Sequence, residues 1–141
     1  MKKIGLLMVG LLVFGQAELT RTDVGVVKDS DTKLEWQDNI LIKKRWNDAI
    51  TYCENLELDN KNDWRLPNIN ELKTIVLETQ YAPTIDKIFK FKTSTPYWSS
   101  TWRKYPSSLY SYRWTVQFND GKIIYWESSD NCDVRCVRDA D

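Results

Sequence analysis

The stretch Trp64-Arg65-Leu66-Pro67-Asn68, followed by Glu71 and Leu72, decides how the middle of this chain folds. Asn68 can cap the start of a helix and Glu71, three residues later, can reach back to it, which is the capping-box arrangement. Pro67 restricts the residue before it to an extended conformation. The stretch therefore predicts an extended segment that turns sharply into a helix, whose buried stripe is Ile69, Leu72, Ile75 and Val76.

Upstream of this stretch, the sequence predicts a hairpin and then a first helix. Two short runs with strand character, residues 24–27 and 34–37, are separated by polar turn formers at residues 29–32. Helical spacing of the apolar residues then indicates an amphipathic helix over about residues 45–56. Its apolar face consists of Trp46, Ala49, Ile50, Cys53 and Leu56.

Downstream, the pattern changes to strands. Residues 97–101 have the character of a buried strand, residues 114–118 alternate between apolar and polar, and Asn119-Asp120-Gly121 is a strong turn signal before residues 123–126. A final strand is expected over residues 133–138. Helices in the first half and strands at both ends predict an α+β domain with two helices packed on a mostly antiparallel sheet.

The first seventeen residues have the features of a secretory signal. Lys2 and Lys3 precede an eleven-residue apolar run, residues 4–14, and Gly15-Gln16-Ala17 offers small residues for cleavage. The run falls short of the roughly 20 residues that a membrane-spanning helix requires. We expect residues 1–17 to be a signal peptide and residues 18–141 to form one exported domain, periplasmic or extracellular, without a membrane span.

The absence of histidine and the distribution of charge limit the kinds of function that this chain can have. The chain has no histidine, which excludes Ser-His-Asp triads, Cys-His pairs and histidine-ligated zinc, and we expect no metal and no cofactor. Between residues 83 and 113 the basic residues outnumber the acids by six to one, which is compatible with a face for anionic partners but is explained slightly better by ordinary solvated surface charge. The basic residues of that segment are Lys87, Lys90, Lys92, Arg103, Lys104 and Arg113.

Three cysteines in an exported chain predict a disulfide and one cysteine outside it. Cys53 lies on the apolar face of the predicted helix and Cys136 lies in the predicted final strand, so both are expected to point into the core. Pairing Cys53 with Cys136 is the preferred alternative, because it closes a long loop. Pairing Cys132 with Cys136 remains open, and a Cys132 left outside the bridge is free or intermolecular.

Three motifs, at residues 64–68, 97–101 and 135–138, occur in the same order as in one bacterial family, which the chain resembles over about residues 25–138. This is the domain of unknown function typified by the C-terminal domain of the Legionella collagen-like adhesin. The resemblance implies a C-type-lectin-like fold with adjacent N- and C-terminal strands and a bridge from a helix cysteine to a last-strand cysteine. The lectin calcium triplets, Glu-Pro-Asn and Gln-Pro-Asp, are absent from this sequence.

The motif residues are expected to shape the fold, whereas a nearby segment is the candidate site. The structural motif consists of Trp64, Arg65, Leu66, Pro67 and Trp98. The candidate ligand-binding residues are Trp102, Arg103, Lys104, Tyr105 and Arg113, because aromatic faces stack on sugar rings and basic side chains pair with sulfate or carboxylate. The family resemblance also implies sulfated polysaccharides as the ligand.

The sequence thus predicts an exported, non-catalytic binding module for an acidic glycan at the cell surface or envelope. A module that binds a surface protein is the alternative, since exposed aromatic and arginine side chains are typical interface anchors. A remote alternative is an enzyme of the formylglycine-generating type, whose fold is related and in which Cys132 and Cys136 would be the reactive pair. Nucleic acid is not expected, because the chain carries an export signal and is acidic without it.

Overall fold

The computed structural model describes residues 18–103, with the side chain of Arg103 left out, and residues 111–141. The expected signal peptide, residues 1–17, therefore lies outside the described residues. The helices and strands are β1 (Leu19–Arg21), β2 (Val26–Asp29), β3 (Leu34–Gln37), β4 (Lys43–Lys44), α1 (Trp46–Glu54), α2 (Ile69–Lys73), β5 (Pro96–Arg103), β6 (Tyr112–Gln117), β7 (Lys122–Glu127), β8 (Cys132–Asp133) and β9 (Val137–Asp139).

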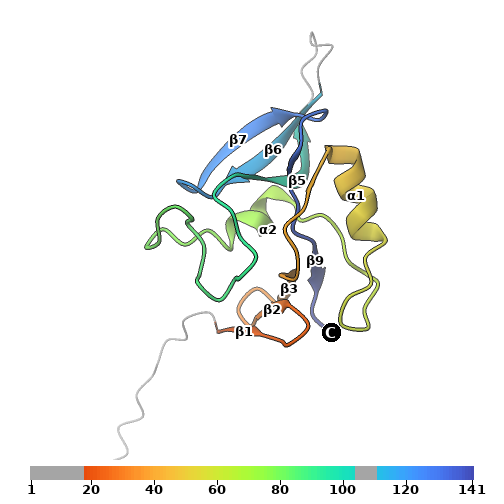
Figure 1. Cartoon of the computed structure of the whole chain (residues 1–141), viewed down its shortest axis with the longest axis vertical. Helices are drawn as coiled ribbons and strands as arrows, with labels where there is room; N and C mark the ends of the chain where they lie inside the picture. The colour runs from red at the N-terminus through yellow and green to blue at the C-terminus, as the bar shows by residue number, and fades with distance from the viewer. Residues whose placement is uncertain (1–17, 104–110) are drawn as a thin grey trace, which may run out of the picture.

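The strands form two sheets, where the sequence predicted one. A four-stranded sheet has the order β1-β2-β3-β9, and a five-stranded sheet has the order β4-β8-β5-β6-β7 (Figure 1). Every pairing within the sheets is antiparallel except that of β5 with β8. The architecture is α+β, as predicted. Because β9 pairs with β3, the first and last strands lie in one sheet, but β1 and β9 are at its opposite edges and are not adjacent as the resemblance implied.

The final strand is the element on which the sequence prediction was wrong. Instead of one strand over residues 133–138, β8 and β9 belong to different sheets. Between them Arg135 is almost fully buried and donates hydrogen bonds to the carbonyl oxygens of Gln37 and Phe91, both at 2.6 Å. These bonds hold the chain between the two sheets, so it cannot continue along one hydrogen-bonded ladder.

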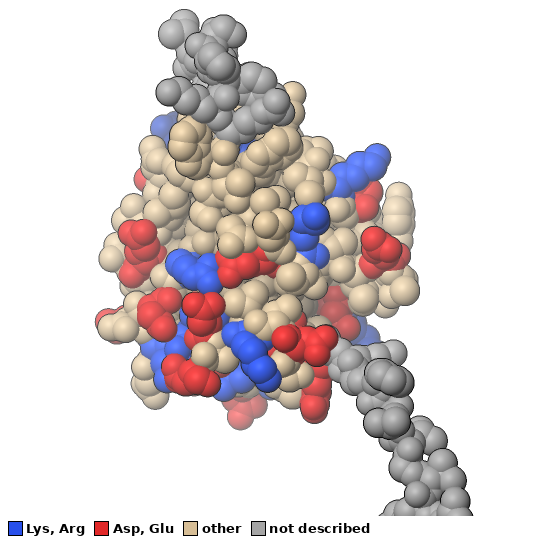
Figure 2. All heavy atoms as spheres, turned by 180° about the vertical axis from the view of Figure 1, so that it is seen from behind, with Lys and Arg blue, Asp and Glu red and all other residues tan. Residues whose placement is uncertain are grey.

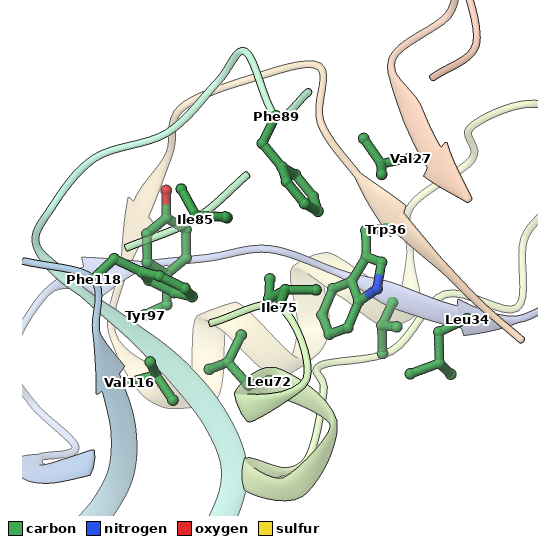
Figure 3. Close-up of a cluster of buried hydrophobic side chains, with 11 residues drawn as sticks. Val27, Leu34, Trp36, Leu72, Ile75, Ile85, Phe89, Tyr97, Val116 and Phe118 are labelled. Atoms are coloured by element: carbon green, nitrogen blue, oxygen red, sulfur yellow. The ribbon is translucent and has the colours of Figure 1, made fainter. Parts of the chain in front are cut away.

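Two clusters of buried apolar side chains join the helices to the sheets. The first, drawn in Figure 3, joins Trp36 of β3, Leu72 of α2 and Tyr97 of β5. The second joins Ala49 and Cys53 of α1 to Trp98 of β5. Because successive side chains of a strand point to opposite faces, the neighbours Tyr97 and Trp98 place α2 and α1 against opposite faces of the five-stranded sheet. Burial of these aromatic rings supplies much of the stabilising apolar area.

Both predicted hairpins are confirmed. β2 pairs with β3 so that Val27 lies opposite Trp36, and β6 pairs with β7 so that Val116 lies opposite Ile123. The second turn contains Gly121, whose φ of 76° is a left-handed conformation that favours glycine. The Asn-Asp-Gly signal therefore located this turn correctly.

The capping box of α2 is also confirmed. The amide of Glu71 donates to Oδ1 of Asn68 at 2.8 Å, and the amide of Asn68 donates to Oε1 of Glu71 at 2.9 Å. The helix is shorter than its apolar stripe suggested, since Ile75 and Val76 lie beyond its end at Lys73. The carboxylate of Glu71 also accepts two hydrogen bonds from Arg65, at 2.6 and 2.7 Å.

The remaining motif residues lie at the junction of the two sheets. The backbone of Arg65 pairs with that of Val137 in an antiparallel bridge. The neighbouring residues Trp64, Leu66 and Pro67 are all buried. The indole of Trp98 is fully buried and donates to the carbonyl oxygen of Lys44 at 2.7 Å. These contacts are the structural corner that the sequence predicted for this motif.

Replacing Glu71 by glutamine is expected to lower the free energy of unfolding by about 1 kcal/mol at neutral pH. Burial raises the pKa of Glu71, but the hydrogen bonds from Arg65 and from the amide of Asn68 outweigh it, so its pKa lies below the usual value of 4.5. A lowered carboxyl pKa contributes stability above the unfolded pKa, and this contribution is lost as pH falls through the folded pKa. Urea denaturation at neutral and then lower pH should show the two proteins converging; a pH-independent difference would contradict this account.

Candidate functional site

The structure brings two of the predicted ligand-binding residues together on the five-stranded sheet. Trp102 of β5 lies directly opposite Arg113 of β6, and Arg113 lies directly opposite Trp126 of β7. Residues directly opposite each other in an antiparallel pair share one face of the sheet. Trp102 and Trp126 are 57% and 40% exposed, so a tryptophan is open to solvent on each side of the arginine.

A third tryptophan completes this arrangement from α1. The guanidinium carbon of Arg113 lies 3.9 Å from the ring centroid of Trp46 and 5.8 Å from that of Trp102. Trp46 is the first residue of α1, and its indole N–H donates to the carbonyl oxygen of Ser99 at 2.9 Å, which fixes the ring against β5. We call Trp46, Trp102, Arg113 and Trp126 the tryptophan–arginine face.

The electrostatics of this face centre on Arg113. One terminal nitrogen, Nη1, donates to the carbonyl oxygen of Tyr112 at 3.0 Å, whereas Nε is buried and has no hydrogen-bond partner in the described part of the chain. Burial lowers the pKa of Arg113 from its usual value of 12.5, although a guanidinium remains charged at neutral pH. The face thus offers a poorly solvated cation between aromatic rings, an arrangement suited to a ligand with both a flat apolar surface and a negative charge.

The sequence missed two members of the face. Trp46 entered the sequence analysis only as part of the apolar stripe of a helix, and nothing in its spacing showed that it stacks on an arginine. Trp126 could have been found, because the Asn-Asp-Gly turn fixes the hairpin register and places Trp126 opposite Arg113.

The other predicted site residues are only partly described. Arg103 lies opposite Tyr112 in the register of β5 with β6, next along the strand from Trp102. The side chain of Arg103 and the whole of Lys104 and Tyr105 lie outside the described residues. Their part in a ligand site therefore stays a prediction.

The basic residues singled out in the sequence are distributed over two different parts of the fold. Lys87, Lys90 and Lys92 precede β5, whereas Arg113 lies on β6. On the face shown in Figure 2, charged side chains of both signs gather over the lower part of the molecule, while the upper part, which contains β5 to β7 in Figure 1, is largely uncharged.

The cysteines adopt the preferred pairing. Cys53 of α1 and Cys136, just before β9, form a disulfide that closes a loop of 83 residues in sequence separation. Cys132 is a free, buried thiol. Burial, followed by the nearby carboxylates of Asp130 and Asp133, raises the pKa of Cys132 to about 12.

No group of three or more histidine, cysteine, aspartate or glutamate residues among the described residues is arranged to hold a metal ion. None of the helices in this part of the chain has the length and apolar character needed to cross a membrane.

A family model described as the Lcl C-terminal domain matches residues 25–138 of the chain. A comparison with curated proteins found no significant match. The match covers both sheets from just before β2 to within β9, including the disulfide and the tryptophan–arginine face.

Proposed function

The chain belongs to the Lcl C-terminal domain family, and from that premise we propose that it is an exported, non-catalytic binding module that recognises an acidic glycan through the tryptophan–arginine face. A sulfated glycan is the ligand class that suits this face best. We further propose that the domain has a C-type-lectin-like fold and acts at the cell surface or envelope. The pairing of β3 with β9 and the bridge from α1 to Cys136 support this fold.

The observation that carries the proposal is the order Trp102, Arg113, Trp126 across three neighbouring strands. Adjacent strands lie about 4.8 Å apart, so the backbones that carry the two tryptophans are separated by about 10 Å with the arginine between them. Sugar rings can stack on the exposed indoles while a sulfate or carboxylate pairs with the guanidinium. A linear acidic glycan running across the strands would therefore meet an aromatic ring, a cation and a second aromatic ring in turn.

The state of the cysteines supports a non-catalytic role. Cys136 is bonded to Cys53, and the pKa of Cys132 is raised to about 12, so the Cys132 thiol is protonated at neutral pH. The thiolate is the reactive form of cysteine, and a buried, protonated thiol is a poor nucleophile. This state of Cys132 and Cys136 favours a binding role over the formylglycine-generating alternative.

Retention of the purified protein on a column of immobilised sulfated glycan, eluted with a salt gradient, tests the proposed function. We expect salt-sensitive retention, because ion pairing with a polyanion weakens as ionic strength rises. Replacing Trp126 by alanine should reduce the affinity by about five-fold or more, since stacking on one aromatic ring contributes on the order of 1–3 kcal/mol. Arg113→Gln should reduce both the affinity and the dependence on salt.

The same strand supplies a matched control. Tyr125 precedes Trp126, is 49% exposed and lies opposite Trp114, on the other face of the sheet. Tyr125→Ser should leave retention close to that of the unaltered protein. Equal losses from Tyr125→Ser and Trp126→Ala, or passage of the unaltered protein through the column at low salt, would reject the glycan site.

A protein-binding module is the second candidate, favoured by the solvent exposure of Trp102 and Trp126 beside an arginine. Tryptophan and arginine are the residues most often found at the energetic centres of protein interfaces. Affinity for a surface protein that is lost on Trp126→Ala but insensitive to salt would favour this candidate over a polyanionic glycan.

A further inference from the structure

Two irregular segments away from the tryptophan–arginine face run side by side in the same direction. At one end, the carboxylate of Asp38 accepts hydrogen bonds from the amides of Lys90 and Phe91, at 2.8 and 3.1 Å. At the other end, Nζ of Lys43 donates to Oγ1 of Thr95 at 3.4 Å. Residues 39–43 therefore lie alongside residues 90–95, and we call these two segments the paired loops.

The paired loops expose large apolar side chains close together. Ile40 and Leu41 are 45% and 50% exposed, and Phe91, beside them on the second segment, is 38% exposed. Single exposed apolar residues are ordinary on protein surfaces, but a group on adjoining loops is characteristic of an interaction site. These three residues are absent from both buried clusters of the domain.

Buried polar contacts hold the paired loops in place from beneath. The carboxylate of Asp38 is fully buried and also accepts hydrogen bonds from Arg21 at 3.0 Å and from Arg135 at 2.9 Å. Arg135 in turn donates a hydrogen bond to the carbonyl oxygen of Phe91. At the other end, the buried carboxylate of Asp133 accepts a hydrogen bond from Thr93 at 2.8 Å. The apolar side chains are thus presented on a supported framework, and a partner need not order them on binding.

The charge beside these apolar residues is positive. Lys90 is exposed, and Lys92 is half-buried one residue beyond Phe91. Lys43, whose side chain is 52% exposed, lies at the far end of the first segment. The carboxylates that support the loops, Asp38 and Asp133, are buried and engaged in hydrogen bonds, so they present little negative charge to a partner.

We propose that the paired loops dock onto an anionic lipid surface, with Ile40, Leu41 and Phe91 entering the interfacial region and Lys90 and Lys92 contacting the head groups. Apolar insertion combined with attraction between lysines and anionic lipids is how peripheral proteins bind membrane surfaces. The complementarity of charge favours an anionic bilayer over a neutral one. This surface is separate from the glycan site, so either proposal can fail without the other.

Sedimentation of the purified protein comprising residues 18–141, without the apolar run at residues 4–14, with vesicles tests this inference. The vesicles contain either phosphatidylcholine alone or phosphatidylcholine with phosphatidylglycerol, and binding is expected only to the anionic vesicles. Combining Lys90→Gln and Lys92→Gln should lower the partition coefficient by about five-fold for each lysine. Combining Ile40→Ser, Leu41→Ser and Phe91→Ser should lower it by at least about ten-fold, because binding scales with the buried apolar area.

Matched substitutions outside the paired loops control for surface charge and hydrophobicity in general. Tyr81→Ser removes another exposed aromatic side chain, and Lys73→Gln removes an exposed lysine on α2. Neither should alter vesicle binding, and Trp126→Ala, which disrupts the glycan site, should not alter it either. Each variant is compared by its urea midpoint to confirm that it folds.

Three results would overturn the inference. One is failure of the unaltered chain to sediment with anionic vesicles at low salt, and another is equal binding by the triple serine variant. The third is sedimentation equilibrium showing that the unaltered chain is a dimer and the triple serine variant a monomer, which would assign the paired loops to contact with a second copy of the chain.

Discussion

Asp38→Asn is expected to lower the free energy of unfolding by about 3–5 kcal/mol, the cost typical of removing one partner from a buried ion pair. The carboxylate is fully buried and accepts from Arg135, which is itself 3% exposed. It also accepts from Arg21 and from the amides of Lys90 and Phe91. Removing the charge leaves the guanidinium of Arg135 buried without its counter-ion and weakens the attachment of residues 90–91.

Urea denaturation followed by tryptophan fluorescence measures this loss. Asp23→Asn is the matched control, because Asp23 is an exposed aspartate in the turn before β2, and its replacement should change stability by less than about 0.5 kcal/mol. A similarly small change for Asp38→Asn would mean that the negative charge of Asp38 contributes little to stability, contrary to this account.

Replacing both Cys53 and Cys136 by alanine is expected to lower the free energy of unfolding by about 4.5 kcal/mol on the chain-entropy model of disulfides. The bridge spans 83 residues in sequence and joins α1 to the segment that enters β9. Without it, the unfolded chain regains the conformations that the closed loop excludes. For a small domain this loss is a large share of the total stability.

Reducing the disulfide between Cys53 and Cys136 gives an independent measure of its contribution to the free energy of unfolding. The unaltered protein in excess reductant should show the urea midpoint of the double alanine variant, whereas the variant itself should not respond to reductant. Cys132→Ala retains the bridge, so its midpoint should still shift on reduction. A Cys132→Ala protein that no longer responds to reductant would place Cys132 in the bridge, contrary to the structure.

The local elements were largely predictable because their signals are local. The capping box at Asn68 and the Asn-Asp-Gly turn each depend on a few consecutive residues, and both appear as expected. The pairing of Cys53 with Cys136 followed from the apolar surroundings expected for both residues and matched the family resemblance. Of the candidate site residues, Trp102 and Arg113 lie directly opposite each other, and their part in ligand binding stays a prediction.

The division into two sheets was not predictable in the same way, because it depends on contacts between residues far apart in sequence. Arg135 lies in a stretch with strand character, yet its bonds to Gln37 and Phe91 interrupt the strand. Nothing near Arg135 in the sequence identifies those partners. Likewise, the stacking of Trp46 on Arg113 depends on how α1 sits against the five-stranded sheet.

The placement of β8 and β9 determines when this domain can fold during its synthesis. Residues 132–139 supply a strand to each sheet, one half of the disulfide and the buried arginines Arg135 and Arg138. During synthesis, residues 18–131 are made before β8, β9, Cys136 and the two arginines. Until those residues follow, neither sheet has all its strands and the disulfide cannot form. Folding of the complete domain therefore has to wait until residues 132–139 have been made.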